Sequence, residues 1–134
     1  MDKNIFKAYD IRGKYPKEIN EEVVEKIAAA LARHFKKGEI VVGHDARLSS
    51  PKLYKALISS LKKENSKLAI VKLGLITTPL LYFLVNRVDA SAGIVVTASH
   101  NPKEYNGLKI VGKNAEPLSG QEVWKLVQKY GQEK

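Results

Sequence analysis

Hydrophobic and polar residues follow two different periods along this chain, one typical of strands and the other typical of helices. Short apolar or alternating runs predict strands at residues 5–9, 40–42, 68–73, 92–96 and 108–111. Apolar residues that recur every three or four positions predict helices after Asn20, Ser50, Thr78 and Ser119. This alternation of strands and helices over short connections indicates an α/β fold with right-handed crossovers.

Local signals indicate where these elements begin and how they pack. Asn20, Ser50 and Thr78 suit the N-cap position, and a proline follows both Ser50 and Thr78 at the first helical position. Ser119 and Glu122 have the spacing of a capping box. The apolar run at 40–42 predicts a parallel strand that is covered on both faces. We therefore predict one domain over residues 1–134, a three-layer α/β/α fold with a mixed, mostly parallel sheet of about four strands whose last strand is antiparallel.

A polar loop separates the last two predicted strands. The run at 92–96 is followed by Thr97, Ser99, His100 and Asn101, and then by Pro102 and an Asn-Gly pair. Ser99 is a candidate nucleophile, and His100 beside it is a candidate proton carrier. Since loops on rigid scaffolds commonly hold functional residues, this loop is the candidate site.

The strand after this loop carries a candidate cation. If residues 99–107 connect antiparallel neighbours, Lys109 returns past the start of the loop while Leu108 and Ile110 point the other way. Beside a phosphorylated serine its ammonium can neutralise a developing alkoxide or shuttle a proton. The alternative is that Lys109 is an ordinary exposed lysine of an edge strand.

Two earlier stretches also hold polar residues at predicted strand ends. Arg12 stands beside Gly13, where its guanidinium can meet a phosphate, although an ordinary surface arginine is the alternative. His44, Asp45 and Arg47 follow the strand at 40–42, and ligands of open α/β sheets bind at such carboxyl ends. An Asp45–Arg47 pair that only braces its loop is an equally good interpretation.

The composition narrows the range of partners. The 134 residues are 44% hydrophobic and 28% charged, and no apolar run approaches the roughly 20 residues that span a bilayer, so we expect no membrane partner. The absence of cysteine excludes disulfides and thiol catalysis, and makes a cytoplasmic location the expectation. The net charge of +9 comes from cations that are spread among acidic residues. That distribution favours phosphorylated metabolites, and we expect no nucleic-acid partner.

Several common active-site motifs are absent. Ser99 does not lie in a Gly-x-Ser-x-Gly turn, which argues against a hydrolase triad. The three histidines, His34, His44 and His100, lack the close paired spacing of a metal site. Neither common type of glycine-rich phosphate loop occurs. The polar loop must therefore be interpreted without a standard hydrolase or nucleotide-binding motif.

Five stretches together resemble a known family. They are Tyr9-Asp-Ile-Arg-Gly13, Val42-Gly-His-Asp-Ala-Arg-Leu-Ser-Ser50, Gly74-Leu-Ile-Thr-Thr-Pro79, Thr97-Ala-Ser-His-Asn-Pro102 and Tyr105-Asn-Gly-Leu-Lys109. In this order they resemble the first, phosphoserine-bearing domain of the α-D-phosphohexomutases, the phosphomannomutase/phosphoglucomutase family. The resemblance covers nearly the whole chain, and the Ser-His-Asn-Pro loop is its most specific part.

The resemblance implies a reversible shift of a phosphoryl group between O1 and O6 of a hexose, through a bisphosphorylated sugar. It implies catalytic roles for Ser99, Lys109, His100 and Arg12, with Ser99 as the phosphoserine and Lys109 as the general acid/base. Arg12, Asn101 and Lys109 are implied to bind substrate or phosphate. The Ser99 phosphate is implied to ligate Mg²⁺, and a hexose 1,6-bisphosphate is the implied activator.

The length departs from the family, whose members have four domains. The metal loop, the sugar-recognition loop and the last phosphate-binding loop of the family have no counterpart in this chain. We therefore expect hexose phosphates and the remaining mutase domains as partners, no activity from the isolated chain, and self-association through a surface built to pack on other domains. Mannose, glucose and glucosamine phosphates stay equally open as substrates. A non-catalytic sugar-phosphate-binding or assembly module is the alternative function.

Overall fold

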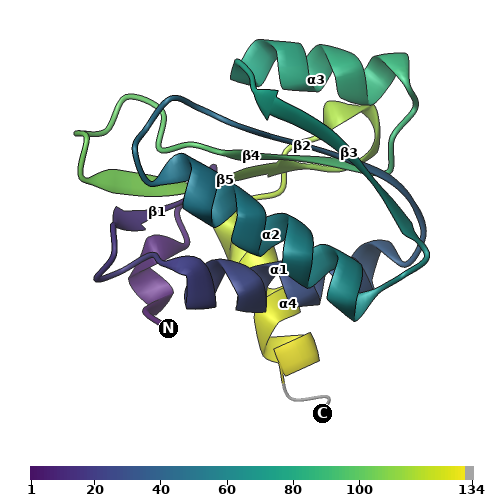
Figure 1. Cartoon of the computed structure of the whole chain (residues 1–134). Helices are drawn as coiled ribbons and strands as arrows, with labels where there is room; N and C mark the ends of the chain where they lie inside the picture. The colour runs from purple at the N-terminus through teal and green to yellow at the C-terminus, as the bar shows by residue number, and fades with distance from the viewer. Residues whose placement is uncertain (132–134) are drawn as a thin grey trace.

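Helices cover both faces of a five-stranded sheet in the computed structural model, which describes residues 1–131 (Figure 1). The strands are β1 (Ile11–Lys14), β2 (Gly38–His44), β3 (Leu68–Leu75), β4 (Ala92–Val96) and β5 (Tyr105–Val111). The α-helices are α1 (Glu21–Phe35), α2 (Ser50–Glu64), α3 (Thr78–Arg87) and α4 (Gly120–Gly131), and the 3₁₀ turns are η1 (Lys3–Ile5) and η2 (Lys113–Ala115). The predicted three-layer α/β/α fold is confirmed, with one strand more than the four expected.

The strand order is β1-β5-β4-β2-β3. β2 lies parallel to both β3 and β4, whereas β5 is antiparallel to its two neighbours, β4 and β1. β4 is therefore the central strand, as its uninterrupted apolar sequence predicts, and all five of its residues are buried. Because His44 at the end of β2 pairs with Val96 at the end of β4, the loops after these two strands leave the sheet side by side.

The core is split by the sheet into two apolar clusters. Ile40 and Val42 of β2 pack on the side covered by α1, α2 and α4, whereas Val41 packs on the side covered by α3. The apolar run at 40–42 thus lies between helices on both faces, as predicted. Among residues 1–131, no helix combines the length and the apolarity that crossing a bilayer requires.

The predicted strand at residues 5–9 is wrong. Ile5 ends η1, which begins where the Asp2 carboxylate accepts the backbone N–H of Asn4. Ile5 and Phe6 are both buried, although consecutive residues of a strand point to opposite faces. A turn closed by the Lys7 N–H and the Asp10 carbonyl then delays the strand to residue 11. Arg12 consequently lies inside β1, and not beyond its end.

Two predicted helix starts are displaced by one residue. α2 begins at Ser50 with Ser49 as its N-cap, and α3 begins at Thr78 with the Thr77 hydroxyl accepting the Leu80 N–H. The Ser50 hydroxyl is engaged elsewhere, because it donates to Asp45. Asn20 caps α1 as predicted, by accepting the Val23 N–H. The remaining strand and helix predictions are confirmed within a few residues.

His34 in the last turn of α1 gives the fold a dependence on pH. Desolvation, and then the charges of Lys129 and Lys36, lower the pKa of His34 from its ordinary value of 6.5. The unfolded chain therefore binds the proton more readily, so this contribution is present above pH 6.5 and is lost as the pH falls below it. We expect acidification from about pH 7.5 to about 5.5 to lower the Tm, and His34→Gln to reduce that loss. Equal losses in the two proteins would contradict this assignment.

Candidate functional site

The Ser99 loop, residues 97–104, leaves the carboxyl end of β4 and projects from one end of the sheet (Figure 1). Thr97 continues the β4–β5 ladder, since its N–H donates to the Gly107 carbonyl at 2.9 Å. Its hydroxyl oxygen accepts the Ser99 N–H at 3.1 Å. Ser99 has φ of 55°, a left-handed conformation that a serine keeps only where its surroundings hold it. Ser99 and His100 are exposed, so a ligand can reach both residues.

A buried carboxylate holds the two predicted cations together. Asp10 is only 4% exposed, and its Oδ1 accepts a hydrogen bond from Arg12 Nε at 2.7 Å. Its Oδ2 lies 3.9 Å from Lys109 Nζ. Sequence reasoning missed Asp10 because the first strand was placed too early. In β1 and the turn before it, Asp10 and Arg12 are two residues apart and therefore point to the same face of the sheet.

The sheet register places this cluster on the face covered by α3. Lys109 pairs with Val95, whose side chain packs in the cluster with α3, and Arg12 pairs with Gly107 on the same face. Leu108 and Ile110 are buried on the other face. The prediction that Lys109 turns away from its two apolar neighbours is therefore confirmed. With 25% of its side chain exposed, Lys109 is half-buried and not a fully solvated edge residue.

Arg12 and Asn101 line one cavity of about 250 Å³ between η1, β1 and the Ser99 loop. Lys7 and Tyr105 contribute to the same wall. Lys7 is a further cation that sequence reasoning missed, because it stands in the stretch that was assigned to a strand. Glu18 also lines the cavity, so its two basic side chains stand beside one carboxylate. Basic side chains and amides can bind an anionic ligand, and the cavity extends the candidate site toward the N-terminus.

Not all predicted site residues touch one another. Arg12 and Lys109 meet at Asp10, and Arg12 and Asn101 share the cavity. The side chains of Ser99 and His100 make no hydrogen bond within residues 1–131, so neither is bonded to Arg12 or Lys109. The catalytic and binding roles of these residues therefore stay predictions.

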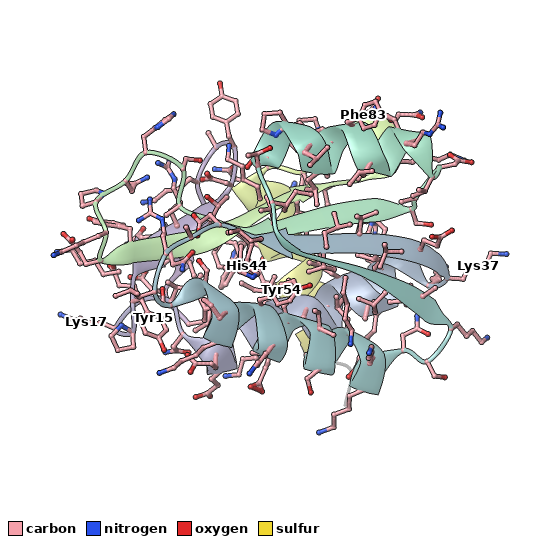
Figure 2. All side chains as sticks on the ribbon, turned by 45° about the horizontal axis from the view of Figure 1, so that its top comes forward. Tyr15, Lys17, Lys37, His44, Tyr54 and Phe83 are labelled. Carbon is pink, nitrogen blue, oxygen red and sulfur yellow. The ribbon has the colours of Figure 1, made fainter. Side chains whose placement is uncertain are left out.

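The side chains of the loop after β2 are used in contacts within the protein. Asp45 Oδ2 accepts Arg47 Nε at 3.2 Å, which confirms the bracing interpretation of this pair. His44 points between the sheet and α2 toward Tyr54, with 4.8 Å between the ring centroids (Figure 2). Its Nδ1 lies 2.7 Å from the Asp45 carbonyl. His44 therefore lies on the face opposite the Arg12–Asp10–Lys109 cluster.

Besides burial, the negative charge of Asp10 in this cluster affects the pKa of Tyr82 in α3. Burial, and then the negative charge of Asp10, raise the pKa of Tyr82 above its ordinary value of 10.0. The phenol consequently stays neutral at physiological pH and adds no negative charge near Arg12 and Lys109. The cluster on this face therefore combines two cations, Arg12 and Lys109, with one carboxylate, Asp10.

The sequence and the fold both match a known family. Residues 3–134 match the family described as phosphoglucomutase/phosphomannomutase, alpha/beta/alpha domain I. The chain belongs to this family, as the resemblance at the Ser99 loop predicts. A "Phosphohexose mutases" protein of Xanthomonas campestris pv. campestris is 45% identical over 114 residues, which are 85% of this chain and 25% of that protein. A "Phosphomannomutase" of Klebsiella pneumoniae is 41% identical over 128 residues, which are 96% of this chain and 80% of that protein.

Solved structures agree with this assignment. A phosphoglucomutase/phosphomannomutase family protein of Burkholderia thailandensis has a TM-score of 0.83 and 33% identity over 98% of this chain and 31% of its own. A putative phosphomannomutase of Thermus thermophilus has a TM-score of 0.82 and 32% identity over 92% of this chain and 29% of its own. The chain therefore spans about a quarter to a third of the length of the Xanthomonas, Burkholderia and Thermus relatives.

Proposed function

We propose that this chain is the phosphoserine-bearing domain of a hexose-phosphate mutase, and that Ser99 carries the phosphoryl group. The observation that supports this most is an exposed, left-handed serine beside a face on which one buried carboxylate holds two cations. Relatives over most of the chain are named phosphomannomutase or phosphohexose mutases. Phosphoryl transfer depends mainly on positioning and charge neutralisation, and this face offers both.

Each residue receives a role in the proposed transfer. A sugar hydroxyl oxygen bonds to phosphorus, the bond between phosphorus and the Ser99 oxygen breaks, and the sugar keeps the phosphoryl group. The Lys109 ammonium gives a proton to the leaving Ser99 oxygen and takes up the sugar hydroxyl proton in exchange, so Lys109 ends the step as it began it. Arg12 and Asn101 bind the phosphate or the sugar, and His100 stands beside the serine. In the reverse direction a bisphosphorylated hexose restores phosphoserine, which makes it the activator.

Magnesium enters this proposal only through the Ser99 phosphate. Within residues 1–131, no three His, Asp or Glu side chains are grouped so that they could hold a metal ion. Two aspartates of the site, Asp10 and Asp45, are paired with Arg12 and Arg47. This chain alone does not fit a Mg²⁺ site, and further ligands would have to come from the rest of the enzyme. The ion would neutralise charge on the transferred phosphoryl group.

Exposed apolar side chains support a partner for this domain. Leu75 at the end of β3 and Phe83 of α3 are 68% and 60% exposed, and Phe83 lies on the side of α3 away from the sheet (Figure 2). Large exposed apolar groups commonly mark contact surfaces. We propose that the remaining mutase domains, in the same or another chain, cover this surface, and that the isolated chain self-associates through it.

The proposal predicts that the isolated chain converts no hexose phosphate, because the other walls of the site are missing. The part of the Burkholderia thailandensis protein that this chain does not cover, when fused or added to the chain, is expected to restore mutase activity. A coupled assay with mannose 1-phosphate and glucose 1-phosphate measures the turnover. Turnover by the purified chain alone would contradict the prediction. Saturable sugar-phosphate binding without activity in any combination would favour the non-catalytic module.

A further inference from the structure

The Arg47 guanidinium is saturated by hydrogen bonds. Its five N–H groups meet five oxygen atoms, of which one is a carboxylate and four are backbone carbonyls. They are Asp45 Oδ2 at 3.2 Å from Nε, the carbonyls of Pro102 and Tyr105 at 2.7 and 3.1 Å from Nη1, and the carbonyls of Ser99 and Asn101 at 2.9 and 2.8 Å from Nη2. Arg47 thus joins the β2–α2 connection to three residues of the Ser99 loop and to the first residue of β5.

We call Arg47 with its five oxygen partners the Arg47 clamp. Hydrogen bonds connect this clamp to β5, the strand that carries Lys109. Asp45 Oδ1 accepts the Arg47 N–H at 3.1 Å and the Ser50 hydroxyl at 2.5 Å. The Ser50 hydroxyl oxygen in turn accepts Nδ2 of Asn106 at 3.0 Å, and Asn106 is fully buried in β5. Arg47 itself is only 14% exposed. The clamp is therefore a partly buried polar network that continues into the sheet, and not an isolated ion pair.

The Ser99 loop depends on this clamp for much of its order. Apart from Arg47, the loop is held by the Thr97 hydroxyl on the Ser99 N–H, by Asn101 on the Ala98 carbonyl, and by the Tyr105 N–H on the Pro102 carbonyl. All of these bonds are local. Two distant segments also reach the loop. The Tyr15 N–H donates to the Glu104 carbonyl at the end of the loop, at 2.8 Å, whereas Arg47 binds Ser99, Asn101 and Pro102 in its middle. The left-handed Ser99 conformation needs such an external restraint.

The two arginines of the site differ in what they leave free. Arg12 uses Nε on Asp10, and its terminal nitrogens make no hydrogen bond within the part of the chain that the structure describes. Arg47 has no N–H left for a phosphate, because an arginine carries five donors and all five are engaged. A lysine has three donors on one atom, so it cannot reproduce this fork.

We infer that Arg47 is a positioning residue, which fixes the backbone of the Ser99 loop and makes no contact with the phosphoryl group. Arg47 holds the loop backbone in the unphosphorylated chain, whereas its effect on phosphoryl transfer rests on the proposed function. Small displacements of a reacting group can cost about 100-fold in rate. Arg47 therefore sets the position of Ser99 relative to the bisphosphorylated hexose that phosphorylates it, and Arg12 binds the phosphoryl group that is transferred.

The test compares Arg47→Lys and Arg47→Ala with Arg12→Ala in the 134-residue chain. Amide hydrogen exchange measured by NMR follows the N–H group of Asn101 in the loop, that of Tyr105 directly after it and that of Ile94 in β4. The first two are called the loop amides below. Both Arg47 variants are expected to exchange the loop amides about tenfold faster, with Ile94 unchanged. Millimolar guanidinium ion is expected to restore protection in Arg47→Ala but not in Arg47→Lys. Arg12→Ala, the matched control, is expected to leave the loop amides protected.

A second readout separates this inference from the proposed function. In the chain supplied with the missing domains, phosphate incorporation at Ser99 is expected to slow about 100-fold in both Arg47 variants. Loop amides that stay protected in both variants would overturn the inference. Equal acceleration at Ile94 would also overturn it, because Arg47 would then stabilise the whole fold. If the wild-type chain takes up no phosphate while the Arg47 variants lose loop protection, the proposed function fails and the clamp stands.

Discussion

Ser99→Ala is expected to abolish mutase turnover when this chain is joined to the missing domains. The alanine retains the loop backbone that Arg47 holds but removes the oxygen that we propose carries the phosphoryl group. Loss of a nucleophile in a well-characterised hydrolase costs about 10⁶-fold in kcat, and we expect a loss of similar order here. The initial rate of hexose 6-phosphate formation in a coupled assay measures the effect.

A matched serine control distinguishes this role from a general effect of substitution. Ser59 is exposed on α2, far along the chain from the Ser99 loop, and Ser59→Ala should keep the wild-type rate. Both variants should unfold at the wild-type temperature, because neither serine side chain is buried. A Ser99→Ala enzyme that keeps more than a few per cent of the wild-type rate would contradict the proposed role.

Gly107→Ala is expected to destabilise the fold by about 3 kcal/mol, the upper end for overpacking. A Cβ at this position would lie 1.8 Å from the Ile11 carbonyl oxygen and 3.0 Å from the Arg12 Cα. These are backbone atoms of β1, so the strand must move away from β5 to make room. Urea denaturation of the wild type and the variant measures the difference.

Gly131 offers the control for this glycine. A Cβ added there meets no atom within 4 Å, and Gly131→Ala at the end of α4 should be neutral or slightly stabilising. Since Arg12 pairs with Gly107 across the two strands, Gly107→Ala should also displace Arg12 relative to Lys109. A Gly107→Ala protein as stable as the wild type would contradict this prediction, because β1 would then move away from β5 without lowering the free energy of unfolding.

Features that depend only on residues close together in the sequence were predictable. The period of apolar residues and the cap at Asn20 placed α1, and the uninterrupted run at 92–96 placed β4 at its observed bounds. Lys109 was correctly assigned to the face opposite Leu108 and Ile110, because strand geometry alone decides it.

Features that arise from tertiary contacts were not predictable. The turn that delays β1 depends on one backbone hydrogen bond and on the packing of Ile5 and Phe6, which an alternating pattern does not reveal. The Asp45–Arg47 pair could be recognised, but the four carbonyls that Arg47 binds lie more than 50 residues further on. Local sequence has no signal for such a contact, so the clamp appears only in the structure.

The central claim is that Ser99 is the phosphoryl carrier. The most direct measurement is the intact mass of the chain after incubation with a hexose 1,6-bisphosphate, Mg²⁺ and the missing domains, followed by peptide fragmentation to locate the phosphate. The account predicts one phosphate on the wild-type chain, placed on Ser99, and none on Ser99→Ala. Equal phosphorylation of the two proteins, or a phosphate on another residue of the wild type, would contradict it.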